Sequence, residues 1–543
     1  MSEMITVGDA IARTLESYGV DTLFGVISIH NLPIADAVGQ RGKMRFVPSR
    51  GEAGAVTMAD AHGRFSGLGV ALTSTGAGAG NAVGALVEAM NAGTPLLHLT
   101  GQVEKAWLDA DTGFIHETRD QLGFLRASSR RAYRVNSPNQ AIAILHRAIQ
   151  EAQTPPCGPV SVEIPIDIQS AKIPLSLVTA PVAPPASKMP DIETLWQQLQ
   201  QARRPLLWIG GGALRCQNAV KRLADAGVTV ISSTHGRGIL PDSHPRSLRA
   251  FHNSPSIEAL LEQCDLTLVA GSRLRSNETR SWTLTLPQPR LQIDIDPAAA
   301  SRNYVMDAMY TGDCDSILTA LADRIVGKPW ADTAWDTDIA TGVKQAEAAL
   351  REQCGAYAEL NDAIENALPQ DGILVRDITV SGSLWGSRLF RATNPLGNIH
   401  SLAGAIGMGL PMAIGTALAR PDKKVIGLVG DGGLSLNLGE LATLAQERAN
   451  VTLLVMNDGG YGVMRGIQDK YFGGRQYYNE LHTPDFTALA QAMGLQAWTI
   501  SSADRFNAVM AEAIAMPGPS VVEVRMKGIG ELKFAGPPQK TLY

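Results

Sequence analysis

Short apolar runs alternate along this chain with longer stretches in which apolar and polar residues follow a helical repeat. The apolar runs show no polar alternation, which is the pattern of strands buried on both faces of a parallel sheet. Helical stretches such as 485–493 lie between them. The alternation predicts an α/β fold of doubly wound parallel sheets. The clearest strands are expected at 70–73, 206–209, 266–269 and 451–455.

Two interruptions divide this pattern into three blocks. A Pro-rich stretch at 172–190 indicates a semi-extended linker, and a softer boundary covers 326–356. We therefore expect domains at 1–171, 191–326 and 356–543. Three domains agree with a chain of 543 residues, because a domain usually holds about 100–200 residues.

Composition excludes several classes of protein. Lys plus Arg is 47 and Asp plus Glu is 52, a net charge of −5 without a basic run, which argues against a nucleic-acid binder. No signal peptide is evident, and no apolar run reaches the roughly 18–20 residues of a membrane span. The five cysteines are widely separated, which favours neither a zinc site nor a redox dithiol. We expect a cytoplasmic protein that binds neither nucleic acid nor membrane.

The strongest chemical signal is a pair of glycine-rich turns after neighbouring strands. An apolar strand at 425–429 leads into Gly430-Asp431-Gly432-Gly433 and a helix at 438–448, and the next strand ends in Asn457-Asp458-Gly459-Gly460-Tyr461. Ligands bind at this carboxyl edge of open parallel sheets. Two carboxylates suit Mg²⁺, and glycines let backbone N–H groups approach phosphates. Two ordinary βα turns are the alternative, but the pairing favours a magnesium diphosphate site.

These turns resemble the signature of thiamine diphosphate (ThDP) enzymes of the acetolactate synthase, pyruvate decarboxylase and benzoylformate decarboxylase superfamily. That signature is a GDG turn followed some two dozen residues later by a paired Asn turn. The resemblance implies pyrimidine-binding, central and diphosphate-binding domains in chain order. It also implies that Asp431, Asp458 and the carbonyl of Gly460 hold Mg²⁺. Asp458 replaces the usual second Asn, which keeps an oxygen ligand and adds a negative charge.

The resemblance extends to further cofactor contacts. The segment 404–411 looks like the one that grips the aminopyrimidine, with Ile406 at the large apolar position that props the cofactor into its bent shape. A polar strand end at 377–383 occupies another family position. A tightly packed helix start and a common polar turn are the alternatives. The implied cofactor contacts are Thr379, Ser381, Gly404, Ile406, Gly430, Asp431, Gly432, Gly433, Asp458, Gly460 and Tyr461.

A carboxyl near the front of the chain is the candidate activating group. Glu52 follows a short strand at 45–48 and opens a helix rich in small residues, where an acidic residue also pairs routinely with the helix dipole. The family has an Arg-His-Glu segment at this place, and this chain reads Arg50-Gly51-Glu52. ThDP chemistry needs such a carboxyl to share a proton with the aminopyrimidine, so that the thiazolium forms its C2 ylide.

Candidate substrate contacts come from two loops and one helix. Ile29 and His30 lie in a loop that reads Ile27-Ser28 where the family commonly has Pro-Gly, and His116 falls where it often has Gln or His. Each imidazole is a proton relay or, alternatively, a surface or structural histidine. Ile467 stands where acetolactate synthases keep a Trp that selects the second oxo acid.

Together these features predict a ThDP- and Mg²⁺-dependent 2-oxo acid decarboxylase or carboligase, a lyase or a C–C bond-forming transferase that acts through the ylide and an enamine. An aldehyde is the expected acceptor in ligation. The resemblance implies a homodimer or homotetramer with Glu52 facing another subunit's diphosphate domain. The alternatives are an acetolactate synthase-like or benzaldehyde lyase-like carboligase, an FAD-dependent oxidase and a silent ThDP-binding regulator. FAD is not favoured, since the central Gly210-Gly211-Gly212 is no GxGxxG and no acidic ribose partner is evident.

Overall fold

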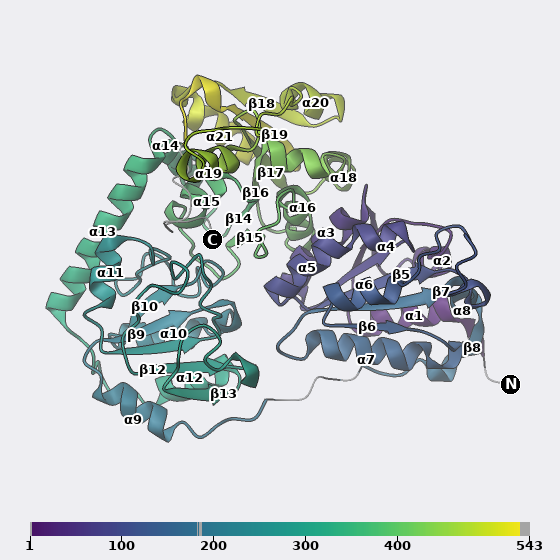
Figure 1. The fold of residues 1–543 in the computed structure, drawn as a ribbon, viewed down its shortest axis with the longest axis horizontal. Coiled ribbons are helices and arrows are strands. Elements are labelled where there is room, and N and C mark those ends of the chain that lie inside the picture. The colour runs from purple at the N-terminus through teal and green to yellow at the C-terminus, as the bar shows by residue number, and fades with distance from the viewer. Residues whose placement is uncertain (1–2, 182, 184–186, 533–543) are drawn as a thin grey trace.

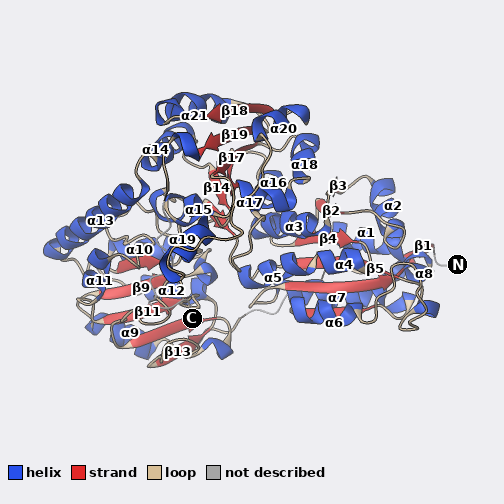
Figure 2. Ribbon diagram, turned by 45° about the horizontal axis from the view of Figure 1, so that its top comes forward, coloured by secondary structure: helices blue, strands red, loops and turns tan. Residues whose placement is uncertain are grey.

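The computed structural model describes residues 3–181, 183 and 187–532. Three parallel sheets follow one another along the chain, and helices cover both faces of each (Figures 1 and 2). This confirms the expected α/β class with three sheet domains. Each sheet falls inside one of the expected ranges, while the exact domain boundaries stay a prediction.

The N-terminal domain has a six-stranded sheet in the order β3-β2-β4-β5-β7-β6. Its four inner strands are buried throughout, because helices pack on both sides. Its strands are β2 (Thr22–Gly25), β3 (Arg45–Pro48), β4 (Gly69–Thr73), β5 (Leu96–Gln102), β6 (Arg131–Arg134) and β7 (Pro159–Pro165). Its helices are α1 (Val7–Ser17), α2 (Leu32–Arg41), α3 (Glu52–Ser66), α4 (Ala77–Asn81), α5 (Val83–Ala92), α6 (Gln121–Ser128), α7 (Ala141–Gln153) and α8 (Ile166–Ser170).

The Pro-rich stretch after this domain begins as structure rather than as linker. β8 (Lys172–Pro174) pairs antiparallel with β1 (Met4–Thr6), so the expected semi-extended segment is tied to the first domain at its start. Strand pairing explains the difference, since the backbone groups of an extended segment bond to an edge whenever one is available. Residues 182 and 184–186 of the stretch, which include Pro184 and Pro185, lie outside the described residues.

The central domain has a five-stranded parallel sheet in the order β10-β9-β11-β12-β13. A long helix, α13 (Thr333–Cys354), then runs toward the C-terminal domain through the region expected as a soft boundary (Figure 1). The strands are β9 (Pro205–Ile209), β10 (Thr229–Ser232), β11 (Leu266–Ala270), β12 (Arg290–Asp294) and β13 (Ala308–Thr311). The other helices are α9 (Glu193–Gln201), α10 (Gln217–Asp225), α11 (Pro255–Leu261) and α12 (Cys314–Asp323).

The C-terminal domain has a six-stranded parallel sheet in the order β15-β14-β16-β17-β19-β18. The strands are β14 (Ile373–Arg376), β15 (Asn398–His400), β16 (Val425–Gly430), β17 (Val451–Asn457), β18 (Gln496–Ile500) and β19 (Ser520–Arg525). The helices are α14 (Tyr357–Ala367), α15 (Val380–Ser383), α16 (Gly409–Ala419), α17 (Asp431–Leu434), α18 (Glu440–Glu447), α19 (Gly462–Tyr471), α20 (Phe486–Ala492) and α21 (Phe506–Ala515).

Small residues bring the N-terminal and C-terminal domains into close contact where α3 lies against α16 (Figure 1). A β carbon at Gly415 would collide with the backbone oxygen of Met58, so only glycine fits at this crossing. Ala55, Ala59 and Ala413 are fully buried nearby. The sequence rich in small residues after Glu52 therefore serves a packing purpose, because it lets two helices approach closely.

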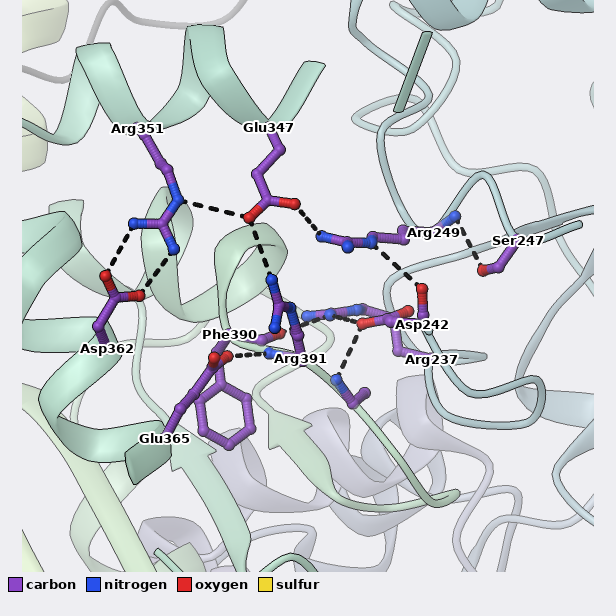
Figure 3. A network of polar contacts seen from close by, with 11 residues as sticks. Arg237, Asp242, Ser247, Arg249, Glu347, Arg351, Asp362, Glu365, Phe390 and Arg391 are labelled. Atoms are coloured by element: carbon purple, nitrogen blue, oxygen red, sulfur yellow. Dashed lines mark hydrogen bonds and ion pairs between the residues drawn. The ribbon is translucent and has the colours of Figure 1, made fainter. Parts of the chain in front are cut away.

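Charged side chains join the central and C-terminal domains on the other side of the molecule. Glu347 of α13 accepts from Arg249 at 3.0 Å and from Arg351 and Arg391 at 3.4 Å (Figure 3). Arg351 also pairs with Asp362 at 2.7 Å. These contacts fix α13 against both domains and leave the carboxyl edge of the C-terminal sheet to another role.

Candidate active site

The two predicted carboxylates lie side by side at the carboxyl edge of the C-terminal sheet. β16 and β17 are neighbours in register, with Gly430 opposite Met456, so Asp431 and Asp458 leave the sheet at one level. Asp431 is 1% exposed, and its Oδ2 and the Oδ1 of Asp458 are buried without a hydrogen-bond partner among the described residues. Burial, and then the neighbouring Asp458 charge, raise the pKa of Asp431 to about 7.

This pair of unpartnered carboxylate oxygens suits a cation. Burial raises the pKa of Asp458, against the opposing effect of Arg465, whose guanidinium lies 2.7 Å from Oδ2. Two adjacent buried acids are costly without a positive charge between them. In the described part of the chain, no group of three or more His, Cys, Asp or Glu side chains could hold a metal ion. A metal here would complete its shell with backbone and ligand oxygens, as Mg²⁺ commonly does.

Glycines keep space open around the two carboxylates. A β carbon at Gly432 would lie 2.9 Å from the Tyr461 ring and 3.1 Å from the carbonyl oxygen of Gly460, which places that carbonyl beside Asp431. A β carbon at Gly462 would collide with Asp458 Oδ2. Gly460 has a φ of +150°, a backbone conformation that side chains disfavour. The residues predicted for the metal and the diphosphate thus meet in one place.

The local helix differs from the expectation in one respect. We expected a turn over 430–433 and a helix at 438–448, but α17 begins directly at Asp431, with Gly430 as its N-cap residue, and α18 starts at Glu440. Close neighbours explain why glycine occupies these helical positions, because a β carbon would have little room there. A β carbon at Gly433, for example, would lie 3.1 Å from Asp377 Oδ2.

The segment predicted to grip an aminopyrimidine packs on this helix start. Gly404 is exposed with a φ of +85°, and Ile406 is half-buried. A β carbon at Gly407 would lie 3.1 Å from the carbonyl oxygen of Gly433. Thr379 caps α15 by accepting from the Gly382 amide at 2.7 Å, and its Cγ2 would meet a β carbon at Gly430 at 3.0 Å.

Ser381 adds a further unsatisfied group near this edge. Its side chain is 1% exposed, and its Oγ has no hydrogen-bond partner among the described residues. The structure therefore brings the predicted C-terminal contacts into one cluster, and their roles toward a cofactor stay predictions.

Glu52 begins α3 and lies under a glycine-rich loop of its own domain. Glu52 is 9% exposed, and its Oε2 accepts from Asn81 Nδ2 at 3.2 Å. A β carbon at Gly78 would lie 2.6 Å from Oε1, so glycine is needed there. The contacts seen for Glu52 come from the N-terminal domain, whereas those of Asp431 come from the C-terminal domain.

The rings of the two candidate histidines lie close to each other in the N-terminal domain. The rings of His30 and His116 have centroids 5.2 Å apart. His30 is 3% exposed, and its Nδ1 has no hydrogen-bond partner among the described residues. Burial lowers the pKa of His30 most, the neighbouring His116 lowers it further, and the negative charge of Glu104 opposes the shift. His116 is exposed, and its carbonyl oxygen would collide with a β carbon at Gly76. The segment 74–81, which includes α4, therefore borders His116 and Glu52.

The remaining predicted substrate contacts lie at the surface of this region or in a helix. Ile29 is 62% exposed beside His30, and Ile467 is half-buried in α19, which follows the Asp458 turn. Ile29 thus belongs with the histidines of the N-terminal domain and Ile467 with the carboxylate pair of the C-terminal domain, and their contact with substrate stays a prediction.

A separate cavity of about 670 Å³ lies between the central and N-terminal domains. The central glycine turn at 210–212 contributes to its wall, and Asp294 and Asp296 reach it from the end of β12. Sequence reasoning missed these acids because they come three strands later along the chain rather than directly after the glycines. The arginines that line the cavity are Arg64, Arg215, Arg273, Arg275 and Arg302.

Comparison with known proteins identifies the family. Models of "Thiamine pyrophosphate enzyme" domains, the pyrophosphate being ThDP, match as the N-terminal TPP binding domain (5–124), the central domain (192–321) and the C-terminal TPP binding domain (380–524). Acetolactate synthase isozyme 1 large subunit of Escherichia coli (strain K12) is 26% identical over 536 residues, covering 96% of this chain and 94% of that protein.

Two further relatives match over similar lengths. "Probable 2-ketoarginine decarboxylase AruI" of Pseudomonas aeruginosa is 29% identical over 533 residues, covering 96% of this chain and 94% of that protein. "Probable acetolactate synthase large subunit" of Methanocaldococcus jannaschii is 26% identical over 549 residues, covering 95% and 91%. Within the described residues, every helix is too short or too polar to cross a membrane. With ThDP-binding domains at both ends of the matched region, the chain belongs to the thiamine diphosphate-dependent enzymes of the acetolactate synthase and decarboxylase superfamily.

Proposed function

We propose that this enzyme uses ThDP and Mg²⁺ to decarboxylate a 2-oxo acid, and that it then releases an aldehyde or joins the fragment to an aldehyde acceptor. The observation that supports this most is that one oxygen of Asp431 and one of Asp458 are buried without a hydrogen-bond partner in the part of the chain that the structure describes. Together with the Gly460 carbonyl they offer the oxygen ligands of an octahedral Mg²⁺ that also binds a diphosphate. The cofactor contacts proposed around them are those predicted from the sequence.

The bound coenzyme supplies a carbon that adds to the substrate's keto group and accepts the electrons left by carbon dioxide. In this proposal the carboxyl group of Glu52, 9% exposed at the start of α3, shares a proton with the aminopyrimidine. His30, kept neutral near pH 7 by burial, and His116 bind the substrate carboxylate and move a proton to the product. Ile29 and Ile467 shape the apolar part of the substrate pocket.

We further propose a homodimer or homotetramer in the cytoplasm, with each site completed by two subunits. Large apolar side chains are exposed around the histidines, and a second copy would cover them. Trp107, 43% exposed, stacks on Phe114 with ring centroids 5.7 Å apart. Ile27 and Ile115 are 59% and 66% exposed. This supports a subunit contact at the edge that carries Glu52.

The carboligase alternatives use the same coenzyme and differ from the proposal in their reaction product. An acetolactate synthase-like or benzaldehyde lyase-like carboligase would form or cleave 2-hydroxy ketones, and two relatives carry acetolactate synthase names. Ile467 at the position of the family's Trp favours a decarboxylase. Retention of Glu52 and both aspartates argues against a silent ThDP-binding regulator.

A substrate screen tests the proposal. Purified enzyme with ThDP and Mg²⁺ is offered aliphatic, aromatic and guanidino 2-oxo acids, with and without an added aldehyde, and carbon dioxide and carbonyl products are measured. The guanidino acid is included because one relative is named for 2-ketoarginine. We expect carbon dioxide release that requires both ThDP and Mg²⁺. Release from none of the acids, with 2-hydroxy ketone cleavage instead, would favour the lyase alternative.

The basic cavity beside the central domain keeps FAD as an alternative second cofactor. Its arginines and its two aspartates could hold the phosphates and a ribose of a dinucleotide. The absorbance of the freshly purified protein decides this, because a flavin absorbs near the blue end of the visible spectrum. We expect a colourless protein.

A further inference from the structure

The segment between β15 and α16 carries Gly404 and Ile406, and two buried carboxylates from outside the segment hold its ends. Its middle is open, since Gly404 is exposed and Ile406 is half-buried. Exposed backbone of this kind has little packing to fix its position. The geometry of the middle therefore depends on how its two ends are anchored.

Glu88 of α5, in the N-terminal domain, anchors the first end. It is 1% exposed, and its Oε2 accepts from Ser401 Oγ at 2.7 Å and from the Ala403 amide at 2.8 Å. Its Oε1 accepts from the Leu402 amide. Arg64 lies 3.7 Å from the same carboxylate and thereby supplies a compensating charge.

Asp377, directly after β14, anchors the second end. It is 1% exposed, and its Oδ2 accepts from the amides of Gly407 at 2.9 Å and Gly409 at 3.2 Å. Gly407 has a φ of +83°, and its carbonyl oxygen accepts from Asn437 Nδ2 at 2.7 Å. Charge-assisted hydrogen bonds to backbone amides are among the stronger polar contacts in proteins.

Two other domains meet the first end as well. Arg64 donates to the His400 carbonyl at 3.2 Å, and Arg275 of the central domain donates to the Leu402 carbonyl at 2.6 Å. The start of the segment is thus tied to the N-terminal and central domains, although the segment belongs to the C-terminal domain. A change in how the domains sit together would move it.

We propose that Glu88 and Asp377 are positioning residues that hold the 400–409 segment at the height where Gly404 and Ile406 meet the coenzyme. Glu88 thereby makes the cofactor site of the C-terminal domain depend on the N-terminal domain of the same chain. This rests on the proposed function, which assigns Gly404 and Ile406 to cofactor contact. Neither carboxylate touches the coenzyme itself.

Glu88→Gln and Asp377→Asn test the proposal, with Glu347→Gln as the control in another, half-buried interdomain carboxylate cluster. Hydrogen exchange of the cofactor-free proteins should show faster exchange at Leu402 and Ala403 in Glu88→Gln. Asp377→Asn should show it at Gly407 and Gly409. The control should change neither set of amides.

Cofactor binding gives the second readout, measured as the ThDP dissociation constant by calorimetry. Losing a charged acceptor should raise this constant by roughly tenfold or more in Glu88→Gln, with the control unchanged. At saturating ThDP, kcat should fall far less, because the chemical groups remain. Unchanged ThDP affinity in Glu88→Gln would overturn the proposal.

A gentler variant covers the case in which Glu88→Gln does not fold. Ser401→Ala removes a single donor to the same carboxylate, and we expect a smaller rise of the ThDP dissociation constant in the same direction. Unchanged affinity in this folded variant would overturn the proposal. Failure of the proposed function looks different, because the wild-type protein itself would then not bind ThDP.

Discussion

Arg465 pairs with one carboxylate oxygen of Asp458 at 2.7 Å, while the other, Oδ1, stays buried without a partner among the described residues. The extra negative charge that Asp458 brings in place of the family's Asn is therefore balanced within the chain. Burial raises the pKa of both carboxyls, and among the described residues a paired arginine opposes that shift only at Asp458. The two aspartates should contribute unequally to metal binding.

Asp431→Asn should raise the Mg²⁺ concentration for half-maximal ThDP binding by about tenfold or more, because it removes the uncompensated charged ligand. Asp458→Asn should raise it less, because Arg465 already compensates the charge that this variant loses. Tryptophan fluorescence during a Mg²⁺ titration measures both. Arg465→Gln is the control and should tighten Mg²⁺ binding. A larger effect from Asp458→Asn than from Asp431→Asn would contradict this ranking.

The facing histidines should act together in catalysis. His30→Ala and His116→Ala should each lower kcat by about 10²-fold, the lower range for general acid–base groups, with less than additive loss in the double variant. The pKa of His30 lies below its usual 6.5, so any acidic limb of kcat that it causes should lie below pH 6.5 and vanish in His30→Ala. Steady-state pH profiles test this. Fully additive losses of kcat in the double variant would show that His30 and His116 act independently.

Buried neutral histidines should make the fold sensitive to acid. Burial lowers the pKa of His98 to about 3, and its ring nitrogens contact Thr73 Oγ1 at 2.8 Å and Ser161 Oγ at 3.0 Å. The unfolded chain takes up a proton near pH 6.5 and the folded chain does not. The free energy of unfolding should therefore fall by about 1.4 kcal/mol per pH unit for this histidine between about pH 6.5 and 3.

Urea unfolding at several pH values measures that slope. His98→Gln should flatten it by about one proton, even though the variant is less stable overall, while the exposed His482→Gln should leave it unchanged. An identical slope in the wild type and in His98→Gln would show that this histidine does not carry the effect.

Shared sites between subunits should allow two inactive chains to restore each other. When Glu52→Gln and Asp431→Asn chains are co-expressed with different tags, a hybrid dimer contains one site with both groups intact. At a Mg²⁺ concentration too low to load the Asp431→Asn chain, hybrids isolated through both tags should regain activity that neither parent has. Inactive hybrids would place each complete site within one chain.

Much of the C-terminal site could be predicted from the sequence, because its residues follow strands that pair. Asp431 and Asp458 both leave the carboxyl edge of neighbouring parallel strands, so their turns meet without any knowledge of the rest of the fold. The alternating pattern likewise predicted the three parallel sheets. Family resemblance was needed for Glu52 and the histidines, since an acidic residue that opens a helix is common.

Other features depend on contacts that no local pattern reveals. Glu88 meets Ser401 across more than three hundred residues, and Arg275 reaches Leu402 from another domain. The start of α17 at Asp431 was missed because a run of glycines predicts a turn. The close neighbours that leave little room for side chains at these positions become visible only in the fold. Arg465 was missed because the link to Asp458 needs α19 to begin at Gly462.

The activation of ThDP by Glu52 is the central claim, and the exchange of the coenzyme's thiazolium C2 proton for deuterium tests it most directly. The exchange is followed by acid quench and proton NMR on ThDP bound to the wild type and to Glu52→Gln, with ThDP affinity checked in both. We expect exchange on the wild type that is roughly 10²-fold or more faster than on Glu52→Gln, at similar affinity. Equal exchange rates in the two proteins would contradict the account.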